Sequence, residues 1–117
     1  MKYMLLIHHV EILDEAVRLP LMTESVQLAN QLHENGQYLD AGPLYPASET
    51  VSVRVRDGKR FVTDGPFVET REQIGGYFMI DAASLEEAIE IAGRIPGGRI
   101  GAVEVRRVRE VEGLPRV

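Results

Sequence analysis

Residues 63–77 read TDGPFVETREQIGGY, and this stretch connects two segments with strand-like patterns. Its DGPF segment (residues 64–67) is typical of a tight turn, because Asp, Gly and Pro each favour turn backbone angles. The charged side chains of Glu69, Arg71 and Glu72 exceed what a turn needs, and such loops on a rigid scaffold often carry function. The stretch therefore organises both the fold and the candidate site.

The segment before this stretch predicts a β-hairpin. Residues 51–56 read VSVRVR, in which valines alternate with polar side chains as expected for a strand. Asp57-Gly58 is a strong two-residue turn signal, and residues 59–63 return as the partner strand. The basic side chains of this hairpin form a patch that is either a solvated edge or a docking surface for an acidic partner: Arg54, Arg56, Lys59 and Arg60.

Four further strands are predicted, over residues 2–9, 37–44, 75–81 and 101–108. The first and third of these are apolar at both odd and even positions, which suits strands covered on both faces. The strand over residues 37–44 contains Gly42-Pro43, so it must end there, bulge there or lie at an edge.

Two helices are predicted between these strands. The first begins at Pro20, since proline fits the first helical position, and ends near Asn35, because Gly36 can take a left-handed conformation. A capping box at Ser84 and Glu87 begins the second helix, which ends before residues 95–98 (IPGG). Residues 11–19 are expected to be a charged connector.

This order of elements predicts an α+β fold, a ferredoxin-like split βαβ with an antiparallel sheet and an extra β-hairpin. Residues 1–109 form one domain, and residues 110–117 form a C-terminal tail. Two helices on one face leave the other face of the sheet uncovered, and its strands are too apolar to remain in water. We therefore expect a homodimer through the sheet faces.

Composition limits the function classes. The net charge of −5 argues against direct nucleic-acid binding, which needs a basic surface. The absence of cysteine excludes disulfides, thiolate metal sites and cysteine nucleophiles, and no other spacing indicates a metal site or a cofactor. The apolar start of the chain is shorter than a signal peptide or a membrane span, so we expect a cytoplasmic protein without membrane attachment.

The chain resembles the YCII-related proteins of the DGPF (DGPFAETKE) branch. The resemblance rests on residues 2–6 (KYMLL), 53–59 (VRVRDGK), 63–67 (TDGPF), 69–77 (ETREQIGGY) and 103–106 (VEVR). It implies a dimeric α+β barrel, a superfamily that includes small monooxygenases and muconolactone-isomerase-like enzymes. Members of this branch are often encoded beside, or fused to, extracytoplasmic-function sigma factors, which implies a regulatory setting with a sigma factor as a partner.

The chain departs from simpler YCII proteins at one position. Those proteins carry a helical His, followed by an Ala-Gly-Pro segment and a nearby acid, as an implied catalytic pair. Here residues 41–43 keep Ala-Gly-Pro and Asp40 precedes them, but Ser25 stands where the His aligns. The remaining helical histidine, His33, lies near the end of the helix.

Four residues are candidates for catalysis: Asp64, Asp40, His8 and His9. Asp64 either shapes the turn or projects into a cleft between the sheet and residues 64–71. Because successive strand residues face opposite ways, only one of His8 and His9 can point into that cleft. Such a histidine is either a satisfied residue at a strand end or a general base.

Six residues are candidates for ligand binding: Phe67, Glu69, Arg71, Glu72, Gly75 and Gly76. Phe67 would form the cleft wall, and Arg71 could bind a carboxylate or phosphate in bidentate fashion. The alternative for the charged residues is a solvated loop with a weak ion pair. The diglycine precedes a strand rather than a helix, so we expect a bulge or a close approach by a partner or a ligand, not a phosphate loop.

Two function classes follow. The first is a small-molecule-binding protein or enzyme with a cleft between the sheet and residues 64–71. The second is a non-catalytic regulatory or interaction module, which the lack of a metal or nucleophile signature and the missing helical His favour.

Overall fold

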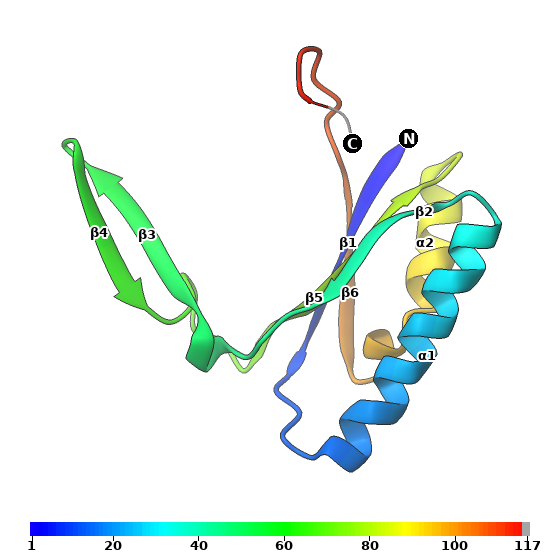
Figure 1. Cartoon of the computed structure of the whole chain (residues 1–117), viewed down its shortest axis with the longest axis horizontal. Helices are drawn as coiled ribbons and strands as arrows, with labels where there is room; N and C mark the ends of the chain where they lie inside the picture. Colours follow the sequence, from blue (N-terminus) through cyan, green and yellow to red (C-terminus); the bar gives the residue numbers. More distant parts are fainter. Residues whose placement is uncertain (116–117) are drawn as a thin grey trace.

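A computed structural model describes residues 1–115 of the chain and has an α+β architecture (Figure 1). Residues 116 and 117 of the expected tail lie outside the described part. The order of elements is β1 (Lys2–Val10), α1 (Glu15–Glu34), β2 (Tyr38–Pro43), a 3₁₀ turn (Ala47–Glu49), β3 (Val51–Arg56), β4 (Lys59–Asp64), β5 (Glu72–Asp81), α2 (Leu85–Gly93), a second 3₁₀ turn (Pro96–Arg99) and β6 (Gly101–Arg107).

Four strands form one antiparallel sheet in the order β2-β5-β1-β6, and β3 and β4 form a separate two-stranded hairpin. Both helices lie on the same side of the four-stranded sheet (Figure 1). The predicted α+β fold, with its antiparallel sheet, its extra hairpin and two helices on one face, is therefore confirmed.

The core lies between the helices and one face of the sheet. Strand β1 runs through the centre of the sheet and alternates: its buried side chains, Tyr3, Leu5 and Ile7, contact the helices. The intervening Met4 and Leu6 lie on the opposite, open face and are half-buried in the single chain. The side chains packed against β1 come from β5 and both helices: Phe78, Ile80, Leu28, Leu32, Ala88 and Ile91.

Helix α1 begins at Glu15, five residues before the predicted start at Pro20. Asp14 is the N-cap, and its carboxylate accepts a hydrogen bond from the Ala16 amide at 2.9 Å. Pro20 therefore lies inside the helix, where it lacks the amide that would reach the Ala16 carbonyl. Residues 15–19 of the expected connector form the first turns of α1 instead, and residues 11–14 remain a connector.

Helix α2 begins at the predicted capping box. The Glu87 amide donates to Ser84 Oγ at 3.1 Å, as expected for Ser at the cap position. The Glu87 carboxylate accepts from the Ala83 amide at 2.8 Å, one residue before the amide that the motif predicts. It also accepts from Gln37 Nε2, which connects α2 to the start of β2.

The diglycine forms the expected bulge. Ile7 pairs with Gly76 and His8 pairs with Ile74, so Gly75 is an extra residue in β5. Strand β5 nevertheless begins at Glu72, three residues before the predicted start. Pro43 lies at the end of β2, an edge strand, where its missing amide interrupts no central ladder.

The β3–β4 hairpin, residues 51–64, extends away from the rest of the protein, and we call it the arm (Figure 1). Asp57 (φ 51°) and Gly58 (φ 73°) form its tip with the two positive φ angles of a type I′ turn. The radius of gyration is 15.9 Å, above the roughly 13 Å that a compact domain of this length has. The arm accounts for this extended shape.

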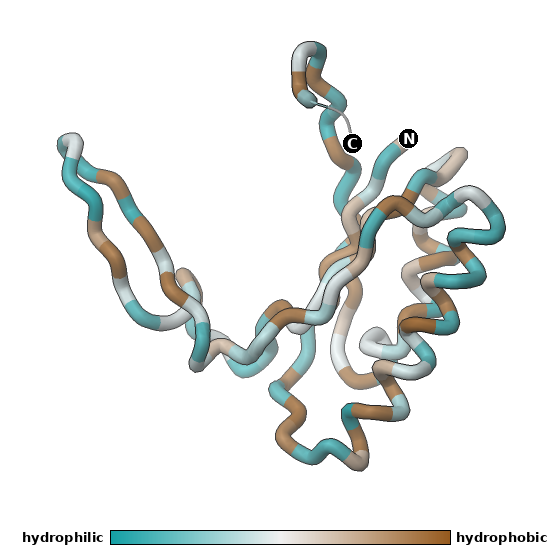
Figure 2. The backbone as a smooth tube through the Cα atoms, viewed as in Figure 1, coloured by the Kyte–Doolittle hydropathy of each residue, from teal (hydrophilic) through white to brown (hydrophobic). Residues whose placement is uncertain are grey.

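The apolar side chains of the arm are exposed. Figure 2 shows apolar and polar residues alternating along β3, whereas the apolar residues of β4, Phe61 and Val62, are adjacent. On one face of the hairpin, Val53 lies opposite Val62, and each is 57% exposed. No helix formed by residues 1–115 is long and apolar enough to cross a membrane.

Candidate functional site

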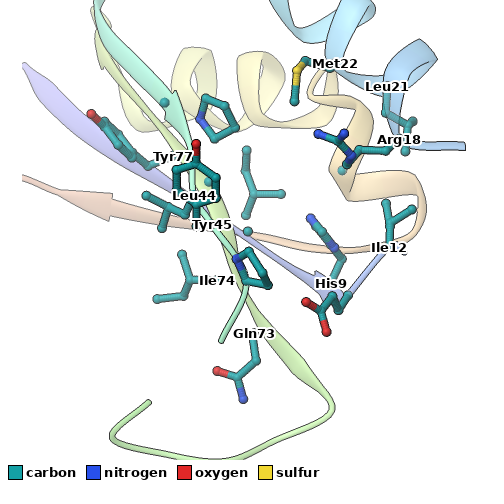
Figure 3. A pocket seen from close by; sticks show the side chains of 18 of the residues that line it. His9, Ile12, Arg18, Leu21, Met22, Leu44, Tyr45, Gln73, Ile74 and Tyr77 are labelled. Atoms are coloured by element: carbon teal, nitrogen blue, oxygen red, sulfur yellow. The ribbon is translucent and has the colours of Figure 1, made fainter. Parts of the chain in front are cut away.

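A cleft of about 1670 Å³ lies between α1 and the end of the sheet where β1 finishes. It is lined by the end of β1 and the chain after it, by α1 along most of its length, by β2 and the chain after it, by β5, by residues 64–71 at the base of the arm, and by Gly97 and Ile100. In Figure 3, Arg18, Leu21 and Met22 come from α1 on one side, and Leu44, Tyr45 and Ile74 lie on the other. His9 lies between these two groups.

His9 enters the cleft with a defined proton position. Its Nδ1 lies 2.8 Å from the Val10 carbonyl oxygen, which can only accept a hydrogen bond. Nδ1 must therefore carry the proton, so the neutral imidazole has a lone pair on Nε2. This nitrogen is the proton acceptor that the cleft offers to a ligand.

Gly75 provides the space for the His9 ring. A methyl group built on the Gly75 Cα would lie 2.2 Å from His9 Nε2 and 2.8 Å from Cε1, closer than atoms can approach. The imidazole therefore packs directly over the glycine backbone. The diglycine thus has two effects: it forms the bulge, and it accommodates the candidate base.

His8 points to the opposite face of the sheet. Its Nε2 lies 2.9 Å from a carboxylate oxygen of Glu104 in β6, on the open face. The alternation of strand residues predicted that only one of the two histidines faces the cleft, and the structure places His9 there. His8 is not among the residues that line the cleft.

Arg18 and the apolar side chains beside it are the part of the site that sequence reasoning missed. Arg18 lines the cleft, and its guanidinium donates to Glu15 at 2.7 Å within the first turns of α1. Placing the helix start at Pro20 hid these residues. Asp14, a good N-cap residue followed by Glu15, is the signal that would have found them.

Residues 64–71 contribute Asp64, Glu69 and Arg71 to the cleft lining. The DGPF segment is also a structural turn: Gly65 has φ 98°, and its amide donates to the Thr50 carbonyl at 2.7 Å. Only glycine adopts this φ without strain. The side chain of Gln73 holds the following loop by donating to the Thr70 carbonyl at 2.7 Å.

The other predicted site residues lie outside the cleft lining. Phe67 is exposed, and the Arg54 guanidinium lies 4.8 Å from its ring centroid, so Phe67 is not the expected cleft wall. Glu72 and Asp40 are exposed and do not contact the cleft either. Phe67 and Glu72 were chosen for their place in or beside the loop, and Asp40 because it precedes the Ala-Gly-Pro segment. Neighbourhood in the sequence does not determine the direction in which a side chain points.

Asp40 pairs with Tyr77 on the open face of the sheet. The Tyr77 hydroxyl donates to the Asp40 carboxylate at 2.8 Å. This hydrogen bond is the main reason that the pKa of Tyr77 is raised above its ordinary value, with smaller contributions from desolvation and from the negative charge of Asp40. The pair therefore keeps the tyrosine protonated rather than activating it.

Ser25 and His33 both line the cleft from α1. The Ser25 hydroxyl donates a hydrogen bond to the Leu21 carbonyl at 2.9 Å, so this donor is already paired with the backbone of α1. The His33 ring packs edge-on against Tyr38, with centroids 6.2 Å apart. Within residues 1–115, no hydrogen bond joins a histidine and an aspartate near Ser25.

The charge of the lining limits the ligand. Two arginines, Arg18 and Arg71, face four carboxylates, so the formal charge of these side chains is −2: Glu11, Glu15, Asp64 and Glu69. Such a lining favours neutral ligands or hydrogen-bond donors over strongly anionic ones. Within residues 1–115, no group of three or more His, Asp or Glu side chains is arranged to hold a metal ion.

Comparison with known proteins identifies the domain. The family model of the YCII-related domain matches residues 1–112. An uncharacterized protein of Rhizobium meliloti (strain 1021) is 38% identical over 78 residues, which covers 60% of this chain and 63% of the relative. The chain therefore spans less than two thirds of the length of that relative.

Proposed function

We propose that this chain, which belongs to the YCII-related family, binds a small, mostly apolar molecule that presents a hydrogen-bond donor to His9. The observation that carries the proposal is the Nδ1 contact with the Val10 carbonyl, which leaves Nε2 of a neutral His9 as an acceptor in a cleft. Ligand sites in proteins commonly combine apolar walls with a few well-placed polar groups.

The walls of the cleft support an apolar ligand body. They include side chains from α1, β1 and the chain that flanks β5: Ile7, Ile12, Leu21, Met22, Leu44 and Ile74. The carboxylates of Asp64 and Glu69 favour a ligand with donor groups, whereas Arg71 offers a site for one acceptor. Phenols, enols and amides combine these properties.

The same nitrogen supports chemistry as well as binding. A neutral imidazole that contacts the donor group of a ligand can remove its proton as a general base. His9 would hold this proton on Nε2 while Nδ1–H continues to donate to Val10. We therefore include proton abstraction from the bound ligand in the proposal, with His9 as the proton carrier.

The adjacent histidines provide a matched pair of variants. We expect His9→Gln to lose binding of small phenols and amides by at least tenfold, measured by saturation-transfer NMR against a library of such compounds. His8→Gln changes a side chain of similar exposure on the opposite face, and we expect its binding to equal that of the wild type. Equal binding by both variants would refute the assignment of His9.

A face of the four-stranded sheet that neither helix covers supports the expected homodimer (Figure 1). The open face of the sheet carries Met4, Leu6 and Tyr77, which are only half-buried. We propose that two chains pack these faces together, which sedimentation velocity at micromolar concentration would test.

A second candidate function is a regulatory or interaction module in the cytoplasm. The basic, exposed arm favours it, because such a surface can dock on an acidic protein. The setting of the DGPF branch makes an extracytoplasmic-function sigma factor the partner to test. Co-purification of the two proteins, lost on charge reversal in the arm but kept in His9→Gln, would favour this alternative over ligand binding.

A further inference from the structure

We propose that the arm, residues 51–64, docks on a second copy of this chain and holds two chains together. The inference does not depend on the ligand of the cleft. It rests on the exposure of the arm, on its charge and on its direction relative to the sheet.

The arm makes few contacts with the rest of residues 1–115. Its two strands contact each other extensively, whereas its contacts outside the arm are local, such as that of Arg54 with the Phe67 ring and the hydrogen bond from Ser52 Oγ to the Gly65 carbonyl. All of its residues except Ser52 are exposed, and Ser52 is partly buried. A lone two-stranded hairpin is at best marginally stable in water, so an arm of this length is expected to find its stabilising contacts elsewhere.

Both faces of the arm carry apolar side chains. One face presents Val51, Val53, Val55 and Val62, which are 57–60% exposed, and the other presents Phe61. Exposed valines on both strands of one hairpin form a contiguous apolar surface. Surfaces of this kind mark interfaces or aggregation-prone edges.

Charge favours a second copy as the partner. The arm carries four basic and two acidic side chains, so its formal charge is +2. Because the whole chain has a net charge of −5, the remaining residues carry −7. We call the residues outside the arm the body. The basic arm of one copy attracts the acidic body of another, which favours association of two copies and disfavours basic partners for the arm.

The direction of the arm suits a clasp. In Figure 1 the arm leaves on the side of the sheet opposite to the helices, and arm and sheet diverge like the two limbs of a V. A second chain seated on the open face would lie between these limbs. The arm would then contact that chain beyond the sheet-to-sheet interface.

The first test compares dimer dissociation constants by sedimentation velocity over a dilution series. We expect the double variant Val53→Asp/Val55→Asp to raise the dissociation constant at least tenfold. The matched control is Val17→Asp on α1, since Val17 is similarly exposed at 50%; its dissociation constant is expected to stay within twofold of the wild type. A second variant, Arg56→Glu/Arg60→Glu, leaves the four valines unchanged and is expected to weaken the dimer most at low salt.

The second test locates the arm on the partner. Lys2 and Lys59 are the two lysines of the chain, and Lys59 lies in the arm. An amine-reactive crosslinker applied to an equimolar mixture of ¹⁴N- and ¹⁵N-labelled chains is expected to give mixed-isotope peptides that contain Lys59. Mixed peptides identify contacts between chains unambiguously.

Three results would overturn the proposal. The first is a wild-type chain that remains monomeric at every concentration of the series up to about 100 μM, well above the micromolar range of weak specific complexes. This result would refute a second copy of the chain as the partner of the arm. Arm variants with the wild-type dissociation constant leave the sheet-face dimer standing but reject the clasp. Crosslinks of Lys59 confined to single-isotope peptides reject it as well.

Discussion

Residues 51–56 and residues 101–107 both alternate valine with charged or small side chains, but the folded chain gives them opposite environments. In β6, Val103 and Val105 pack against the buried core. In β3, Val53 and Val55 are 57% and 60% exposed. Alternation therefore predicts a strand with one apolar face, but it does not identify what covers that face.

The largest expected difference between body and arm comes from the core beside β6. Leu5 is fully buried and pairs with Val105 across β1 and β6. We expect Leu5→Ala to lower the free energy of unfolding by about 2–5 kcal/mol, because it leaves a cavity. Urea unfolding measures this change, and a loss below 1 kcal/mol would mean that the core is poorly packed.

A pair of glycines extends the comparison to the backbone. A methyl group on Gly101 would lie 1.9 Å from the His8 carbonyl oxygen, so we expect Gly101→Ala to destabilise the protein by about 1–3 kcal/mol or more. Gly58 at the arm tip also has a special conformation, φ 73°, but no atom lies near its missing Cβ. Gly58→Ala is expected to strain only the arm. Differential scanning calorimetry would show the main transition shifted in the first variant and unchanged in the second.

The two valine alternations can be compared directly. Val105→Ala removes two methyl groups from a half-buried position and is expected to cost about 1–1.5 kcal/mol. Val53→Ala changes an exposed side chain, so its effect within a single chain is expected to stay below about 0.5 kcal/mol. Urea unfolding at two protein concentrations sharpens the comparison: a Val53→Ala effect that grows with concentration would indicate that a second chain covers the arm.

The smallest effect concerns the open face of the body. The hydrogen bond to Asp40 raises the pKa of Tyr77, so the folded state favours the protonated phenol. This contribution to stability is present below the ordinary tyrosine pKa and is lost as pH rises through the raised value. We expect Asp40→Asn to lower the Tyr77 pKa, measured by NMR titration with ¹³C-labelled tyrosine. An unchanged Tyr77 pKa would refute the role of Asp40.

Local chemistry explains what the sequence predicted correctly. Turn and cap signals such as Asp57-Gly58 and Ser84 act over a few residues, so they identify the hairpin and the start of α2 without knowledge of the fold. The diglycine predicted either a bulge or a close approach by a partner or a ligand, and the structure has a bulge at Gly75. The family resemblance and the α+β fold rest on such signals repeated along the chain.

Other parts of the site depended on tertiary context. Strand β1 is apolar at both odd and even positions, so its sequence did not show that the face shared by Ile7 and His9 is the one under the helices. Pro20 suggested a helix start because proline favours first turns, but Asp14 caps the helix earlier. Arg18 was therefore assigned to a connector, and its place in the cleft was missed.

The position of β1 also determines the order in which the sheet can be completed. This strand comes first in the chain and pairs with β5 and β6, and Tyr3 lies opposite Arg107. A growing polypeptide cannot close the centre of the sheet until nearly the whole domain has left the ribosome. Pairings this distant in sequence slow folding, because a long loop must close before any contact repays the lost entropy. Until β5 and β6 emerge, the apolar residues of β1 need protection from other chains.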